Sequence, residues 1–286
     1  MYRVSRNQLI GSAAATLQVL EVLGTASQPM GLAEITAAVR RPKGTVHRQL
    51  ATLVNTGFAE QDPHTNRYRL TLKAWCVGAR VTQNLDMVGR TRAVLEGLLA
   101  DAQETVHLAV LDQSGFVVYV SKLASPQSIG VQTYLGQLTP AWCTATGRAL
   151  LAFRPNECER ILSGALESRT PRTVTNRGRL RQLIEQVQTQ GYAVTQAENR
   201  ADMGGIAAPV FNHEGWAVSS LGVALPEYRM SDRAVRHLVP LVVRAAQRAS
   251  VALGYRVGED GLGVSMPGGE SCRLGSRKSR AAILDQ

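Results

Sequence analysis

The segment RRPKGTVHRQLATLVNTGF, residues 40–58, gathers three arginines, a lysine and a histidine in a stretch with helical periodicity. At 100° per residue, Val46, Leu50 and Leu53 share one side of a helix over about 42–56, and small, polar and basic residues fall on the other. Guanidinium groups form bidentate hydrogen bonds to guanine, and cationic side chains neutralise phosphates. The outward side is therefore a candidate DNA-reading surface, and the alternative is a solvated charged face.

The elements expected around this helix are those of a winged helix-turn-helix. An amphipathic helix comes first, with Ile10, Ala13, Leu17 and Leu20 recurring at helical spacing. A short helix precedes the basic one, and the turn DPHTN indicates a β-hairpin after it. Gly57 suits the end of the basic helix, where a positive φ is often needed.

The candidate DNA contacts lie on the outward side of this helix, at its start and on the hairpin. Arg48 is expected to contact guanine, and His47 either a base or the backbone. For Arg67 an equal alternative is a solvent-exposed charge on the hairpin that makes no contact with DNA. The full set is Arg41, Lys43, Gly44, Thr45, His47, Arg48, Thr52, His64 and Arg67.

The run GLAEITAAVRRPKGTVHRQLATLVNTGFAEQDPHTNRYRL resembles the DNA-binding half of the IclR family of bacterial transcriptional regulators. One departure is Gly44, where the family commonly has serine. The glycine removes a potential phosphate contact and lowers helix propensity.

The segment AWCTATGRALLAF is the second candidate site, and it could bind a small ligand. Thr144 is expected to cap a helix, leaving the N–H groups of Ala145, Thr146 and Gly147 to attract a carboxylate. Arg148 could pair with such a ligand, but an exposed helical arginine is the favoured interpretation.

The phrases ETVHLAVLD, WCTATGRALLAF, GYAVTQAE and GGIAAPVFNHEGWAVSSLGVALP resemble the effector-binding domain of the same family, related in shape to GAF domains. The resemblance implies an effector site formed by Trp142, Cys143, Thr144, Ala145, Thr146, Thr195, Met203, Ile206, Gly222 and Ala224. Gly222 and Ala224 replace a serine pair found in relatives that bind small keto acids, and Thr195 replaces an acidic residue. We therefore expect a larger, more apolar pocket whose effector is bulkier than pyruvate or glyoxylate, such as an aromatic acid.

The expected fold class is α+β, with a winged helix-turn-helix, a helical linker and an antiparallel-sheet, GAF-like effector domain. We place these at 8–70, 71–86 and 87–257, followed by a disordered basic tail over 258–286. The net charge is +10. Residues 1–75 hold nine Lys/Arg against four Asp/Glu, an excess that favours contact with a polyanion.

Other functional classes find little support in the sequence. The four cysteines, Cys76, Cys143, Cys158 and Cys272, have no metal-ligand or disulfide spacing, so we expect no metal and no cofactor. An enzyme with Cys143 as nucleophile lacks a partner motif, and a thiol-based redox sensor is a weak alternative. Without a stretch of about 18 apolar residues, we expect a soluble, cytoplasmic protein and no membrane partner.

The resemblance implies a transcriptional regulator rather than an enzyme, with no catalytic residues. Its expected partners are double-stranded DNA with a pseudo-palindromic operator, a small organic acid, and further copies of itself in a homodimer or tetramer. The regulated genes are expected to serve catabolism or transport, and repression is favoured over activation.

Overall fold

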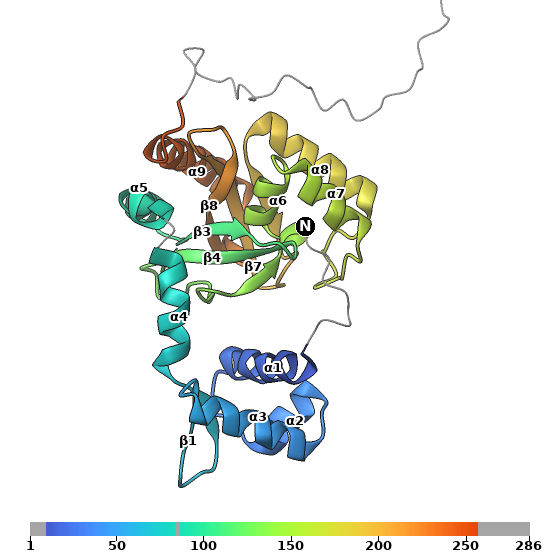
Figure 1. Ribbon diagram of the computed structural model, residues 1–286. Coiled ribbons are helices and arrows are strands. Elements are labelled where there is room, and N and C mark those ends of the chain that lie inside the picture. The colour runs from blue at the N-terminus through green and yellow to red at the C-terminus, as the bar shows by residue number, and fades with distance from the viewer. Residues whose placement is uncertain (1–9, 84–85, 257–286) are drawn as a thin grey trace, which may run out of the picture. The chain divides into compact units, whose positions relative to one another are not determined.

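The computed structural model describes residues 10–83 and 86–256 of the 286-residue chain. These residues form two compact units, divided between Asp86 and Met87, which Figure 1 draws together. The expected basic tail, 258–286, lies outside the described residues, as do residues 8 and 9 of the expected first domain. Within the described part of the chain, no helix is long and apolar enough to cross a membrane.

The first unit is a winged helix-turn-helix. Its strands pair as an antiparallel hairpin, the wing, and a short turn joins its second and third helices. In chain order the elements are α1 (Gly11–Thr25), α2 (Leu32–Val39), α3 (Lys43–Asn55), β1 (Ala59–Gln61), β2 (Tyr68–Leu70) and α4 (Leu72–Gln83).

Helix α3 is oriented as its sequence predicts. Val46, Leu50 and Leu53 are buried in the core of the first unit, which leaves the opposite side of the helix exposed. The helix ends next to Gly57, whose φ of 75° allows the Phe58 N–H to donate to the Leu53 carbonyl.

The helix predicted here is present as α1, but of the residues predicted at helical spacing only Leu20 packs against the core. Ile10 and Leu17 are 71% and 57% exposed. The residues that pack into the core are Ala15, Val19 and Leu23. These three residues follow one another at intervals of four, about one turn, so they form one side of α1, and the first two of them are small.

The second unit is built on a six-stranded antiparallel sheet with the order β5-β4-β3-β8-β7-β6. The strands are β3 (Thr105–Leu111), β4 (Phe116–Leu123), β5 (Leu138–Pro140), β6 (Ala193–Gln196), β7 (Met203–Phe211) and β8 (Ala217–Pro226). The helices are α5 (Asp86–Ala102), α6 (Ala145–Leu151), α7 (Pro155–Ser163), α8 (Arg177–Gln190) and α9 (Asp232–Ala252), with short 3-10 turns at Ala141–Cys143 and Glu227–Arg229. This is the α+β architecture expected from the sequence.

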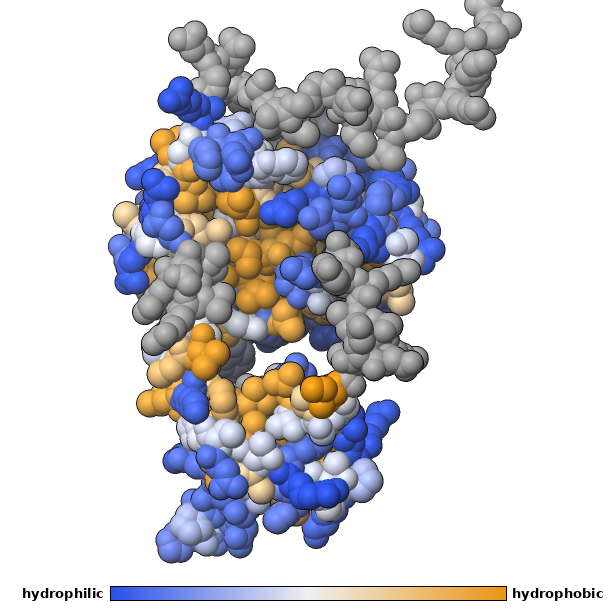
Figure 2. Space-filling view, viewed as in Figure 1, coloured by the Kyte–Doolittle hydropathy of each residue, from blue (hydrophilic) through white to orange (hydrophobic). Residues whose placement is uncertain are grey.

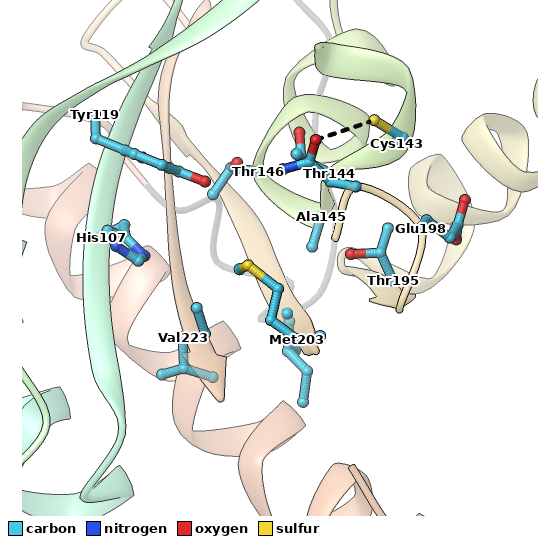
Figure 3. A pocket seen from close by; sticks show the side chains of 15 residues that line it. His107, Tyr119, Cys143, Thr144, Ala145, Thr146, Thr195, Glu198, Met203 and Val223 are labelled. Carbon is cyan, nitrogen blue, oxygen red and sulfur yellow. Dashed lines mark hydrogen bonds between the residues drawn. The ribbon is translucent and has the colours of Figure 1, made fainter. Parts of the chain in front are cut away.

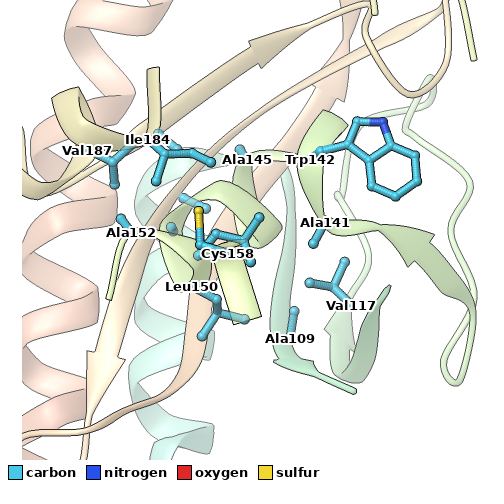
Figure 4. Packing of buried hydrophobic residues seen from close by; sticks show 14 of the residues in the cluster. Ala109, Val117, Ala141, Trp142, Ala145, Leu150, Ala152, Cys158, Ile184 and Val187 are labelled. Carbon is cyan, nitrogen blue, oxygen red and sulfur yellow. The ribbon is translucent and has the colours of Figure 1, made fainter. Parts of the chain in front are cut away.

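Helices cover both faces of this sheet. On one face α6, α7 and α8 pack through a cluster that includes Leu150, Cys158 and Ile184, shown in Figure 4. On the other face α5 and α9 contribute Leu95 and Val242. The central strands are therefore buried on both sides, and polar groups among them must find partners inside the domain.

Candidate DNA interface and effector pocket

The outward side of α3 presents cationic and small side chains to solvent. Lys43, His47 and Arg48 are exposed, and among the described residues their side chains make no hydrogen bond or ion pair. A methyl group added at Gly44 would meet no atom within 4 Å. On the side of Figure 2 that faces the reader, hydrophilic residues cover most of the surface around α3 and the wing. This surface is free to meet phosphates and base edges.

Two of the predicted arginine contacts already have partners elsewhere in the first unit. Arg41 donates from Nε and Nη2 to Oε1 of Gln18, at 3.2 and 2.9 Å. Arg67 donates from Nη1 to the Pro29 carbonyl at 2.7 Å and to Oε2 of Glu34 at 3.1 Å. Arg67 therefore ties the wing to α2, and a DNA contact there competes with an existing ion pair.

The candidate effector pocket lies where α6 and the 3-10 turn before it meet the sheet. Its wall is assembled from β3, β4, β6, β7, β8 and the loop 197–202. Eight of the residues nominated from the sequence line it: Cys143, Thr144, Ala145, Thr146, Thr195, Met203, Ile206 and Ala224. The sequence interpretation missed His107, Tyr119, Glu198, Asn199, Gly204, Gly205 and Val223.

His107 supplies a neutral polar group to this pocket. Its side chain is buried, and Nε2 lies 2.6 Å from Oγ1 of Thr133. The ring stacks on Tyr119 with centroids 4.3 Å apart. Burial, with a smaller contribution from the charge of Lys122, lowers the pKa of His107 to about 3. The imidazole is thus uncharged at neutral pH, and it offers hydrogen bonding without a positive charge.

The Thr146 hydroxyl is a second polar group at the cavity. The residue is 7% exposed, and its Oγ1 has no partner among the described residues within 3.5 Å. The Tyr119 hydroxyl, whose pKa burial raises, is nevertheless close enough for Thr146 to lower that pKa, so a contact between the two is weak and long. In Figure 3 Thr146 points toward the Tyr119 hydroxyl across the top of the pocket. A buried hydroxyl without a partner costs free energy, which a ligand that bonds to it would recover.

The N-terminus of α6 is only partly open to a ligand. Thr144 caps it as expected, accepting a hydrogen bond from the Gly147 N–H at 3.2 Å. The cap consumes one of the three N–H groups that were expected to face a ligand. A Cβ at Gly147 would lie 2.2 Å from the Ala141 carbonyl oxygen, so this glycine allows a close backbone approach.

Cys143 is a protonated, buried thiol. Its Sγ lies 3.7 Å from Oδ1 of Asn199 and 3.8 Å from the Pro140 carbonyl oxygen. Burial raises the pKa of this thiol to about 12, despite the nearby charge of Arg148. Because the thiolate is the reactive form, the environment of Cys143 suits neither a nucleophile nor a redox sensor.

Arg148 is buried, which corrects the expectation of an exposed helical arginine. It is 2% exposed and donates from Nη1 to Oε1 of Glu198 at 2.9 Å and from Nε to the Trp142 carbonyl at 2.8 Å. A second bond joins Nη2 to Oε2 of the same carboxylate. The pair holds the loop that carries Glu198 and Asn199 against α6.

Two nominated residues lie outside the pocket lining. Trp142 belongs to the core cluster, edge-on to Phe116. Gly222 pairs with His107 and Ala207 in the sheet, where a Cβ would fall 2.5 Å from the Ile206 carbonyl oxygen. Gly222 is therefore needed for close strand packing and does not widen the pocket.

The pocket is a small cavity with a mixed apolar and polar lining. Its cavity volume is about 30 Å³, room for about two water molecules. Threonine, tyrosine, histidine, glutamate and asparagine side chains share the lining with apolar ones. In Figure 3 the Met203 side chain reaches into the middle of this space.

Comparison with known proteins bears on both units. Residues 12–63 match the IclR helix-turn-helix domain, and residues 79–251 match the bacterial transcriptional regulator IclR C-terminal domain. The second match alone covers more than half of the chain. The protein belongs to the IclR family.

Relatives of this IclR-family protein cover almost its whole described length. The HTH-type transcriptional regulator KdgR of Escherichia coli is 32% identical over 248 residues, which is 86% of this chain and 94% of KdgR. The structure of an IclR transcriptional regulator from Alicyclobacillus acidocaldarius is 25% identical with a TM-score of 0.73, covering 86% of this chain and 100% of that one. An IclR homologue from Microbacterium hydrocarbonoxydans, complexed with 4-hydroxybenzoate, is 23% identical with a TM-score of 0.71, covering 85% and 99%.

These likenesses fix the class of the protein. The relatives are named transcriptional regulators, and this IclR-family chain is a DNA-binding regulator rather than an enzyme. Regulators of this family bind DNA through the helix-turn-helix, and they bind small-molecule effectors.

Proposed function

We propose that this protein is a repressor whose operator affinity is controlled by a small organic acid bound in the pocket of the second unit. The genes it controls serve catabolism or transport of that acid. Two copies occupy a pseudo-palindromic operator, whose half-sites lie about 34 Å or a multiple of that apart, and the assembly is a homodimer or tetramer. The domain division at 8–70, 71–86 and 87–257 belongs to this proposal.

The DNA-binding part of the proposal rests on the exposed, unpaired cations of α3. Arg48 reads guanine, Lys43 and Arg41 neutralise phosphates, and Gly44 permits close approach of the backbone. The remaining proposed contacts are Thr45, His47, Thr52, His64 and Arg67. Arg41 and Arg67 must exchange their partners Gln18 and Glu34 for phosphate, so their contributions are smaller than that of Arg48.

The effector part rests on one observation, a buried cavity that holds the unpartnered hydroxyl of Thr146. Neutral His107 and the threonine hydroxyls can bond to carboxylate or hydroxyl oxygens, and Ile206, Val223 and Ala224 contact an apolar part of the ligand. The cavity admits an organic acid only when the flexible Met203 side chain moves. How far it moves decides whether a bulkier, aromatic acid fits.

The experiment is a thermal-shift screen of the full-length protein against small keto acids, sugar acids and aromatic acids including 4-hydroxybenzoate. A true effector at about 100 times its Kd adds about 2.7 kcal/mol to the free energy of unfolding. A midpoint rise of several degrees is expected for one acid class. The same compound should change the affinity of the protein for operator fragments selected from genomic DNA.

Two variants make the screen specific for the pocket. Thr146→Val removes the unpartnered hydroxyl while keeping the side-chain shape, and it should reduce the midpoint shift caused by the effector. Thr16→Val makes the same change on the exposed side of α1 and should leave the shift intact. An effector that stabilises wild type and Thr146→Val equally does not bind in this cavity.

A further inference from the structure

A surface groove lies next to the cavity of the second unit. It is lined by residues 168–171 and 199–202, and its volume is about 510 Å³. Asn199 lines both the groove and the cavity, so the two spaces are neighbours. The cavity alone, at about 30 Å³, is too small for an organic acid. The groove is therefore the side from which we expect a ligand to reach the cavity.

The cavity offers hydrogen bonds to a carboxylate but no free positive charge. Among the described residues that line it, none is a lysine or an arginine, and the His107 imidazole is neutral. The Glu198 carboxylate also lines it and is bound to Arg148, so that arginine is already occupied. Burying a further carboxylate without a cationic partner is unfavourable. The charged end of an organic acid is therefore poorly accommodated inside the cavity.

Two arginines line the groove, and they differ in what they already bind. Arg200 donates from Nε to Oδ1 of Asp202 at 3.0 Å and from Nη1 to the Gln132 carbonyl at 2.7 Å. The Arg169 side chain is exposed and makes no hydrogen bond or ion pair with the described residues. Burial raises the pKa of the Cys143 thiol to about 12, and nearby positive charges that include Arg169 oppose that rise. Arg169 is thus a free cation close to the cavity.

The loop that carries Arg169 is fixed to the wall of the cavity. The Thr170 hydroxyl donates to the Ala197 carbonyl at 2.6 Å, and the Thr173 hydroxyl donates to the Glu198 carbonyl at 2.6 Å. The Thr173 hydroxyl also accepts a hydrogen bond from the Arg169 N–H at 3.0 Å. A loop that is already ordered in this way loses less conformational entropy when it binds a ligand than a flexible loop would.

Asn199 adds a second donor where the groove and the cavity meet. Its Oδ1 lies 3.7 Å from Sγ of Cys143, while its Nδ2 makes no hydrogen bond with the described residues. Figure 3 shows Cys143 and Glu198 on the same side of the pocket. A carboxylate accepts hydrogen bonds from amide and guanidinium groups, and those from the charged guanidinium are the stronger. A free amide and a free guanidinium thus line the same groove.

We propose that Arg169 determines the selectivity for acids by binding the carboxylate of the effector, together with Asn199, at the mouth of the cavity. The rest of the effector then enters the cavity beside Met203. This proposal rests on the proposed function and adds the orientation of the ligand to it. Because a guanidinium group is always charged, the preference for an acid over its uncharged amide should come from Arg169.

The test is isothermal titration calorimetry of the full-length protein with pyruvate, gluconate and 4-hydroxybenzoate, each compared with its primary amide. The amide keeps the shape of the acid and lacks its charge. For an acid that wild type binds, the amide should bind about 10-fold or more weakly. Arg169→Gln should raise the Kd of the acid by about 10-fold or more and leave the Kd of the amide nearly unchanged.

Two further variants show whether charge at this position is the cause. Arg179→Gln is the matched control, because Arg179 is exposed on α8 outside the groove and the cavity, and it should bind acids like wild type. Arg169→Lys keeps the charge and should retain most of the preference. A wild-type Kd for the acid in an Arg169→Gln variant with an unchanged melting temperature would overturn the proposal, as would equal binding of acid and amide by wild type. Either result would leave the cavity as the effector site. Failure of wild type to bind any keto, sugar or aromatic acid would instead contradict the proposed function, and this orientation with it.

Discussion

Helix α3 and the candidate effector pocket hold their polar groups in opposite ways. Lys43 and Arg48 are exposed and unpaired within the described residues. Arg148 and Glu198, beside the pocket, are buried and joined by two hydrogen bonds. A solvated charge costs little to keep, whereas a buried charge without a partner costs several kcal/mol. The exposed cations on α3 are therefore available for binding and contribute little to stability. The charged residues beside the pocket also stabilise the fold.

This difference separates the effects of mutation into two kinds. Changes on α3 should alter DNA affinity with little change in the free energy of unfolding. Changes beside the pocket should alter the free energy of unfolding first and effector binding as a consequence. Substitutions of the same residue type in the two regions test this difference, because their effects on DNA affinity and on the free energy of unfolding can be compared directly.

The largest effect is expected from Arg148→Met. The variant leaves the Glu198 carboxylate buried without its partner, which should cost about 3–5 kcal/mol of the free energy of unfolding. Urea denaturation of the full-length protein measures it through the transition of the second unit. Arg48→Met, the same substitution on α3, should change the free energy of unfolding by about 0.5 kcal/mol or less.

A double variant checks the cause of this loss. Arg148→Met with Glu198→Leu removes both charges, so it should recover much of the stability lost in the single variant. A single Arg148→Met variant as stable as wild type would show that the buried pair does not hold the loop to α6.

The next effect concerns Gly147, at the start of α6. A Cβ there would lie 2.2 Å from the Ala141 carbonyl oxygen, and backbone cannot move away as a side chain can. Gly147→Ala should therefore destabilise the protein by about 1–3 kcal/mol or more. Thermal denaturation measures the change, and a melting temperature equal to that of wild type would contradict the tight packing of α6 on the preceding turn.

The DNA-binding unit could be predicted largely from local sequence. Val46, Leu50 and Leu53 are the larger apolar side chains on one side of α3, so periodicity alone assigns its outward face. In α1 the same reasoning fails, because apolar residues lie on several sides. Ala15 and Val19 are buried there, whereas Leu17 is exposed. Which side of α1 is buried is determined by its packing against α3 and not by side-chain size.

The pocket could be predicted only in part. Family resemblance located the α6 region and the residues on β6, β7 and β8, but Glu198 is brought to Arg148 across 50 positions of sequence. Thr133 reaches His107 because of the path that residues 124–137 take between β4 and β5, and that path has no signature in the local sequence. The size of the cavity depends on the conformation of the Met203 side chain and on strand register, and neither follows from residue types alone.

On α3, Arg48→Ala should weaken specific operator binding by about 1–3 kcal/mol, because it removes a bidentate contact to a base. Fluorescence anisotropy with a labelled operator measures the loss. Lys43→Ala, a phosphate contact in this proposal, should instead weaken binding to all sequences and lower the slope of log affinity against log salt by about 1. Unchanged operator affinity in Arg48→Ala would remove this residue from the interface.

The smallest effect is expected at Gly44, the counterpart of Gly147 at the start of the other functional helix. A methyl group at Gly44 meets no atom within 4 Å, so Gly44→Ala only restricts the unfolded chain and improves helix propensity. The free energy of unfolding should rise by about 0.5–1 kcal/mol. Operator affinity should nevertheless fall if the backbone at Gly44 approaches DNA, since the added methyl group then separates α3 from the duplex. A variant that gains stability and keeps full affinity would show that α3 lies farther from the DNA at this end than we propose.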